Sequence, residues 1–175
     1  MAGTGAVPDL SLTEWVVLAV LAEAPTHGFA IAKELRSGTD LGRVITVHRP
    51  LVYRALDRLV SAGLVEQHGT EPSDTGPNRT IHRPTDPGRH ALEGWLDRPV
   101  QHVRDLRIEF LIKLRLNQRR HRNPPPLIAA QRAELADTFD QLTRSRSEDV
   151  VDAWRNVNAT AARLFLDHLA SHGAP

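Results

Sequence analysis

Three short helical segments, followed by two extended segments, are the feature that most constrains the fold of this chain. Apolar residues recur at helical spacing over residues 12–23, 27–36 and 49–62. Ser11 and Glu14 match a capping box, in which each side chain satisfies a backbone donor of the other residue. The spacing therefore predicts three consecutive helices, the first beginning directly after Ser11.

Proline, glycine and serine mark the ends of these helices. Pro25 ends the first helix, and Thr26 is expected to cap the second. A turn cluster follows at residues 37–42, and Gly63 stands where many helices carry a left-handed glycine after their last turn. Pro50 falls in the first turn of the third helix, where its missing N–H is tolerated.

The third helix has one apolar face and one polar face. Its apolar positions recur at helical spacing, so this face is predicted to be buried. They are Val52, Ala55, Leu56, Leu59 and Val60. The solvent face is predicted to carry Arg49, Tyr53, Arg54, Asp57 and Arg58.

Two short β-strands are predicted after the third helix. Residues 64–68 and 79–83 are extended segments, and the loop at residues 71–78 contains two prolines and a glycine. Thr85 begins a further helix, which Pro99 closes. This order is that of a winged helix-turn-helix, in which the third helix enters the DNA major groove.

The second half of the chain is predicted to be entirely helical. Amphipathic segments occupy residues 103–118, 127–142 and 150–170. The predicted fold class is therefore mainly α with a small β-hairpin wing: a winged helix-turn-helix followed by an all-helical region.

Composition excludes several other classes of protein. No cysteine occurs among the 175 residues, which excludes disulfides, thiolate metal sites and cysteine nucleophiles and fits a reducing compartment. The longest apolar run, residues 15–22, is far shorter than the ~18 residues that a membrane span needs. The first nine residues lack the basic segment of a signal peptide. We therefore expect a cytoplasmic protein with no membrane partner.

The net charge of +1 is too small to indicate a nucleic-acid partner, so that inference depends on a local patch. Residues 43–58 carry four arginines and His48 against Asp57 alone. A merely solvated helix face explains this patch about equally well. Residues 1–97 carry 9 basic and 12 acidic side chains, which favours a winged helix used for protein interaction as the alternative.

Four stretches resemble the PadR family of transcriptional regulators. They are Leu12-Thr13-Glu14, Pro25-Thr26-His27-Gly28-Phe29-Ala30-Ile31, Val52 to Val65, and Arg79 to Thr85 with Gly88. Leu106 to Leu114 is similar to the start of the C-terminal helical region in longer members. Phe29 stands where the family usually has tyrosine, and Ile81-His82 replaces its usual wing aromatic.

The resemblance implies a DNA-binding repressor that forms a homodimer through its C-terminal helices and is often tuned by a small molecule. Together with the aromatic residues of the helical half, it suggests control by a small hydrophobic effector or, alternatively, by a partner protein. Two symmetric recognition helices would read a pseudo-palindromic operator in double-stranded DNA. The expected organisation is a flexible tail at residues 1–9, a winged helix-turn-helix DNA-binding domain at 10–97 and a C-terminal helical dimerisation domain at 98–175.

The expected DNA contacts lie on the second and third helices and on the second strand. Arg49 and Arg54 suit guanine edges, because a guanidinium donates to O6 and N7 together. The resemblance implies that Tyr53 contacts the DNA backbone, and Lys33 and Arg79 are placed for phosphates. The full set is Lys33, His48, Arg49, Tyr53, Arg54, Arg58 and Arg79.

An aromatic set is interpreted first as packing in the core or at an interface, with an effector or dimer interface as the functional alternative. It consists of Trp15, Trp95, Phe110, Trp154 and Phe165. His27 and Gly28 are interpreted as structural: the histidine helps to cap the second helix, and the glycine allows close packing.

Metal binding and catalysis are not predicted. His168 and His172 lie four residues apart, but zinc needs a further ligand and a second shell. The chain has no Gly-x-Ser-x-Gly motif, phosphate loop or dinucleotide fingerprint. We therefore expect no metal, no cofactor and no enzyme activity.

Overall fold

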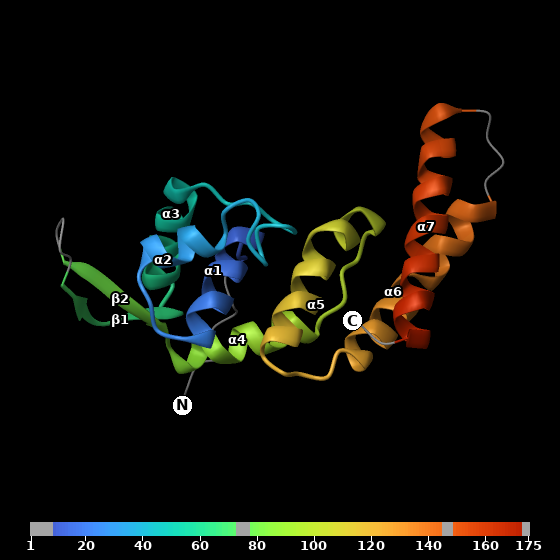
Figure 1. Ribbon diagram of the computed structural model, residues 1–175. Helices are drawn as coiled ribbons and strands as arrows, with labels where there is room; N and C mark the ends of the chain where they lie inside the picture. The colour runs from blue at the N-terminus through green and yellow to red at the C-terminus, as the bar shows by residue number, and fades with distance from the viewer. Residues whose placement is uncertain (1–8, 73–77, 145–148, 173–175) are drawn as a thin grey trace. The chain divides into compact units, whose positions relative to one another are not determined.

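The computed structural model describes residues 9–72, 78–144 and 149–172. The chain divides into two compact units, residues 1–95 and residues 96–175. Figure 1 shows the order of the helices and strands along the chain. The predicted flexible tail, apart from Asp9, lies outside the described residues, as does most of the predicted loop at residues 71–78.

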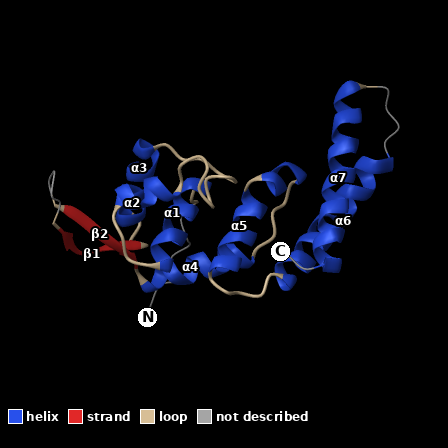
Figure 2. Ribbon diagram, in the orientation of Figure 1, coloured by secondary structure: helices blue, strands red, loops and turns tan. Residues whose placement is uncertain are grey.

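The first unit is a winged helix-turn-helix, which confirms the predicted fold class. Its elements are α1 (Leu12–Glu23), α2 (Gly28–Glu34), α3 (Arg49–Ser61), β1 (Val65–Glu71), β2 (Arg79–Pro84) and most of α4 (Asp86–Asp97). Helix α1 contacts α2, α3 and β2, and α3 also contacts α2 and β1. Figure 2 shows the two strands side by side as the wing.

Local capping explains where these helices begin and end. The capping box of α1 is confirmed: Ser11 N–H donates to Glu14 Oε2 at 2.6 Å, and Glu14 N–H donates to Ser11 Oγ at 3.4 Å. Gly63 has a φ of 69°, the left-handed conformation predicted after α3. Thr85 Oγ1 accepts from Gly88 N–H at 3.1 Å and donates to the Gly63 carbonyl at 2.7 Å.

The hairpin is antiparallel, with Val65 opposite Pro84 and Glu71 opposite Arg79. The register is irregular between Gln67 and Gly69. Thr26, which precedes α2, forms an isolated bridge with His82 of β2. Thr26 N–H donates to the His82 carbonyl at 3.1 Å, and His82 N–H donates to the Thr26 carbonyl at 2.8 Å. The segment before α2 is therefore tied to the sheet.

Two local predictions for the first unit were wrong. Thr26 does not cap α2, because its backbone is extended and paired with His82. His27 is the cap, with Nδ1 accepting from Ala30 N–H at 3.1 Å, which confirms the capping role predicted for it. Val60 was predicted to be buried, yet it is exposed, because it lies about 100° around α3 from the buried Leu59.

The second unit is helical, as predicted. It contains the 3-10 helix η1 (Val103–Arg107) and the helices α5 (Glu109–Arg119), α6 (Pro125–Arg144) and α7 (Val150–His172). The single helix predicted over residues 103–118 is broken at Ile108, where η1 gives way to α5. Helices α6 and α7 pack along each other, and η1 contacts α5 and α7.

Buried polar groups fix the start of this unit. Gln131 donates to the Val100 carbonyl and accepts from its N–H, both at 2.8 Å. Lys113 is almost fully buried; its ammonium lies 2.7 Å from Glu109 Oε1 and donates to the Arg98 carbonyl at 2.9 Å. Burial lowers the pKa of Lys113. These side chains satisfy backbone groups that would otherwise be costly to bury.

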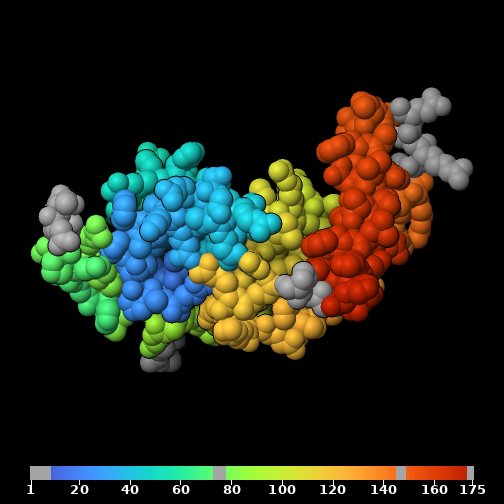
Figure 3. Space-filling view, viewed as in Figure 1, coloured from blue at the N-terminus to red at the C-terminus, as the bar shows by residue number. Residues whose placement is uncertain are grey.

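Helix α7 has two apolar faces. One face supplies Ala159, Leu166 and Leu169 to the core that also contains Leu135 and Phe139 of α6. The other face carries four large apolar side chains that are mostly exposed, although three of them belong to the apolar stripe predicted for this helix. Their exposed fractions are 78% for Val150, 69% for Trp154, 63% for Val157 and 64% for Leu164. Figure 3 shows α7 forming the visible surface along its length.

Candidate nucleic-acid interface

The outer face of α3 presents the predicted cationic side chains. Val52, Ala55, Leu56 and Leu59 are buried, which turns Arg49, Tyr53, Arg54 and Arg58 outward. His48 is the exposed N-cap residue, and its side chain makes no capping hydrogen bond. No acidic residue lies in the first turn of α3, so its N-terminal end is electropositive.

An aromatic and cationic cluster lies where α2, α3 and the wing meet. Phe29 of α2 is 44% exposed, although it is a large apolar side chain. The guanidinium carbons of Arg49 and Arg79 each lie 5.3 Å from the centroid of its ring. Arg49 also lies 5.5 Å from the centroid of the Tyr53 ring. Two predicted DNA contacts from different elements therefore share one ring.

His27 ties this cluster to the wing. Its Nδ1 caps α2, which leaves Nε2 facing Glu71 of β1 and Arg79 of β2, each at 3.5 Å. The neutral tautomer that accepts at Nδ1 carries its proton on Nε2 and donates toward the Glu71 carboxylate. His27 thereby connects the start of α2 to Glu71 of β1.

Gly28 allows α2 and α3 to approach closely, as predicted. A Cβ atom at this position would lie 2.9 Å from Tyr53 Cε1 and 3.0 Å from Leu56 Cδ1. The ring of Tyr53 is thus placed against the backbone of α2, while part of it stays exposed. The short glycine contact sets the orientation of the tyrosine.

The remaining candidates are placed differently. Lys33 is exposed in the last turn of α2, and Arg54 is exposed on α3. Arg58 lies 3.4 Å from Glu14 Oε1, so it also joins α3 to α1. The structure thus brings Arg49, Tyr53 and Arg79 together and places Arg58 partly in a structural role.

The wing contains a histidine in an unfavourable environment for charge. Burial is the main cause that lowers the pKa of His82, opposed by a hydrogen bond with the Thr80 backbone and by the charge of Asp57. Its Nδ1 is buried, with no hydrogen-bond partner within the described part of the chain.

The aromatic candidates occupy three different environments. Trp15 and Trp95 stack on each other, and Trp95 is buried. Phe110 is fully buried in the core of the second unit, so its ring has no surface open to a ligand or partner. Trp154 and Phe165 are exposed and line the same pocket.

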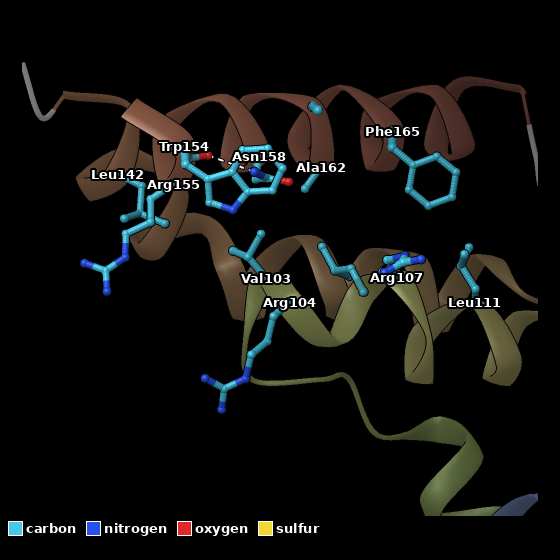
Figure 4. A pocket seen from close by; sticks show the side chains of 12 residues that line it. Val103, Arg104, Arg107, Leu111, Leu142, Trp154, Arg155, Asn158, Ala162 and Phe165 are labelled. Atoms are coloured by element: carbon cyan, nitrogen blue, oxygen red, sulfur yellow. Dashed lines mark hydrogen bonds between the residues drawn. The ribbon is translucent and has the colours of Figure 1, made fainter. Parts of the chain in front are cut away.

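That pocket has a volume of about 600 Å³ and lies between η1, α5 and α7 (Figure 4). Apolar residues make most of its lining: Val103, Leu106, Leu111, Leu142, Trp154, Ala161, Ala162 and Phe165. Arg104, Arg107 and Arg155 also line it, and Asn158 donates to the Trp154 carbonyl at 2.8 Å. Sequence reasoning missed these three arginines, because an isolated arginine on a helix carries no signal of a shared pocket.

Phe29 was likewise missed as a site residue. The available signal was an aromatic side chain directly after the His27-Gly28 pair, but its arginine neighbours are distant in sequence. In the described ranges, no three His, Asp or Glu side chains are grouped so that they could hold a metal ion. None of the helices in those ranges is long and apolar enough to span a membrane.

The class of protein defined by this fold and face is a winged helix-turn-helix protein with a cationic third helix. Residues 17–94 match the model of the Transcriptional regulator PadR-like family. Residues 17–94 therefore carry a PadR-like domain, which confirms the resemblance predicted from the motifs. No curated protein matches the chain.

Solved structures with a similar fold cover most of the chain. PadR from Bacillus subtilis in complex with operator DNA is 18% identical, covers 93% of this chain and 96% of its own, and has a TM-score of 0.50. Bacillus subtilis PadR in complex with p-coumaric acid is 18% identical, with coverages of 93% and 97% and a TM-score of 0.42. The PadR-like regulator BC1756 from Bacillus cereus is 16% identical, with coverages of 97% and 100% and a TM-score of 0.42. At 18% identity, the likeness to the complex with operator DNA concerns the fold alone.

Proposed function

We propose that this protein is a cytoplasmic repressor that binds a pseudo-palindromic operator in double-stranded DNA as a homodimer. The observation that carries the proposal is the exposed arginine face of α3, set on a PadR-like winged helix. The Bacillus subtilis protein with a similar fold binds operator DNA, which supports the same class of partner. A repressor of this kind would act by covering the promoter.

In the proposed complex, α3 lies in the major groove. Arg54 is well placed to read a guanine, because it is exposed on the outer face of the helix and can donate two hydrogen bonds. Tyr53, His48 and Lys33 lie around it and contact the DNA backbone. Arg49 and Arg79 add cationic contacts from the start of α3 and from the wing.

The exposed stripe of α7 is proposed as the dimer interface. Val150, Trp154, Val157 and Leu164 are spaced by four, three and seven residues, which matches the seam of two packed helices. Leaving such a stripe in water is costly, and a second copy of α7 would cover it. A two-fold dimer would place two α3 helices ~34–36 Å apart, or a multiple of that distance.

The pocket in the second unit is proposed as the site of a small hydrophobic effector. Its volume of about 600 Å³ falls within the usual range for small-molecule sites, and most of its lining is apolar. Trp154 belongs both to this pocket and to the exposed stripe of α7. A ligand there would therefore change the surface on which the second copy packs, and so the spacing of the two α3 helices.

The second candidate function is a winged helix that binds another protein without binding DNA. The excess of acidic over basic side chains in residues 1–97 favours it, because generic attraction to DNA is then modest.

The test is binding of the purified protein to a DNA fragment from its own promoter region across a salt series, with unrelated DNA as competitor. We expect binding that survives a large excess of competitor and weakens as salt rises. No binding even at low salt would contradict the proposal and favour the protein partner. Adding candidate ligands to the same assay tests the proposed small-molecule effector. The effector proposal is contradicted if a partner protein changes the affinity for DNA and no ligand does.

A further inference from the structure

We propose that Phe29 is a positioning residue, whose ring holds Arg49 and Arg79 so that the recognition helix and the wing bind DNA as one unit. The inference rests on the proposed function and assigns a task to a residue that contributes little to the core. Phe29 is 44% exposed at the start of α2, where an apolar ring gains little from burial. Its contacts with two arginines are its distinguishing feature.

The first step of the argument concerns Arg49. This residue occupies the first position of α3, where the helix dipole disfavours a cation. No acidic side chain lies in that first turn to offset the cost. The π faces of Phe29 and Tyr53 supply negative potential instead, at 5.3 and 5.5 Å from the guanidinium carbon. The guanidinium is therefore drawn toward the rings.

The second step concerns Arg79, which is the first residue of β2 in the wing. Its guanidinium carbon lies 5.3 Å from the Phe29 centroid, and its Nη1 lies 3.5 Å from His27 Nε2. His27 is fixed in turn by its capping bond to Ala30 and by Glu71. The Phe29 ring therefore holds the wing arginine against α2, while the Nε2–H of His27 is directed to Glu71.

The third step is the consequence of sharing one ring. The two guanidinium groups belong to α3 and to the wing, and each is held at the same distance from Phe29. Without a ring, each long side chain would have to lose its rotamer freedom when DNA binds. A platform that orders both in advance reduces this cost, and a cation–π contact at an exposed site corresponds to about a two- to fivefold change in an equilibrium constant. Removing one arginine also frees the ring, so the two contributions are coupled.

The experiment is a double-mutant cycle on Arg49→Ala and Arg79→Ala, measured by DNA affinity at fixed salt in two backgrounds, wild type and Phe29→Leu. With Phe29 present, we expect the fold-loss of affinity in the double variant to be about three times smaller than the product of the fold-losses in the two single variants. With leucine present, the losses should multiply within about twofold, as for independent sites. Losses that multiply in both backgrounds overturn the proposal.

Two further variants separate positioning from a structural role. Phe29→Tyr keeps an aromatic face and should retain both the affinity and the coupling, whereas Phe29→Leu should lose about five- to tenfold in affinity with an unchanged thermal midpoint. Val60→Ala, an exposed apolar change at the other end of α3, serves as the control and should leave the affinity unchanged. If Phe29→Tyr and Phe29→Leu bind equally well, the ring has no positioning role.

A measurement without DNA distinguishes failure of this inference from failure of the proposed function. The side-chain Nε–H groups of Arg49 and Arg79 can be followed by NMR relaxation in the free protein. We expect restricted motion in the wild type and in Phe29→Tyr, and faster motion of both in Phe29→Leu. Equal mobility in all three overturns the platform, even if the protein binds DNA. If the two arginine side chains show restricted motion but the wild type does not bind DNA, the proposed function is overturned, and so is the role of the two arginines in DNA binding.

Discussion

The indole rings of Trp15 in α1 and Trp95 in α4 lie parallel, with 5.3 Å between their centroids and 5° between their planes. Trp95 is buried and Trp15 half-buried. The stack therefore connects the first helix of the winged-helix unit to the helix that follows its wing. An offset stack of this kind contributes about 0.5–1.5 kcal/mol beyond the burial of the two rings.

The first prediction concerns the strength of this contact. Trp95→Ala should lower the free energy of unfolding by about 3–5 kcal/mol, because it removes a buried aromatic side chain and leaves a cavity. Trp15→Ala should cost less, because Trp15 keeps part of its surface in water. Urea unfolding measures both. Equal, small losses for the two variants would show that the stack is not part of the core.

The second prediction concerns base reading. Arg54→Ala should cost about 1–3 kcal/mol in operator binding and relax specificity at one base position, with little change in the salt slope. Arg89→Ala is the matched control, because Arg89 is an exposed arginine that pairs with Asp86 in α4. Affinities of the wild type and the variant for a set of operators with single-base changes show whether Arg54 reads a base. A uniform loss across all of them would assign Arg54 to a phosphate instead.

The third prediction uses two glycines as a matched pair. Gly28→Ala should destabilise the fold by about 1–3 kcal/mol, because the new methyl group would lie 2.9 Å from Tyr53 Cε1. Gly94→Ala, inside α4 with no atom within 4 Å of the added carbon, should stabilise the fold by up to about 1 kcal/mol. Thermal unfolding of both variants tests the contact between α2 and α3. A stabilising Gly28→Ala would mean that Tyr53 moves away freely.

The fourth prediction concerns pH. Burial lowers the pKa of His82 below its ordinary value of 6.5, so the folded state takes up its proton at lower pH than the unfolded state does. The contribution of His82 to stability is therefore complete above about pH 6.5 and declines as the pH falls below it. Urea midpoints at pH 7.5 and 5.5 should differ less in His82→Gln than in the wild type. His68→Gln, at an exposed position of β1, is the control.

The fifth prediction concerns the exposed stripe of α7. Val157→Glu places a charge in the middle of the stripe and should convert the proposed dimer to a monomer, because a buried unpaired charge is costly. Ala170→Glu changes an exposed position away from the stripe and should leave the dimer intact. Light scattering gives the mass of each. A dimer that survives Val157→Glu would place the interface elsewhere.

Much of the winged helix follows from local sequence. Ser11 with Glu14 and Gly63 specify helix ends through hydrogen bonds or backbone angles within a few residues. Of the five positions of α3 that the apolar spacing predicted as buried, four are buried, because a helix repeats every 3.6 residues whatever lies nearby. The error at Val60 arose because periodicity does not give the width of the covered face.

The sequence by itself thus determined the order of the helices, the hairpin and the family of the first unit. Only the tertiary structure decided that Thr26 pairs with His82, that Trp95 meets Trp15, and that Phe29 lies between two arginines. The physical reason is that these contacts join segments distant in the chain. Their geometry depends on how whole elements pack, which no local spacing encodes.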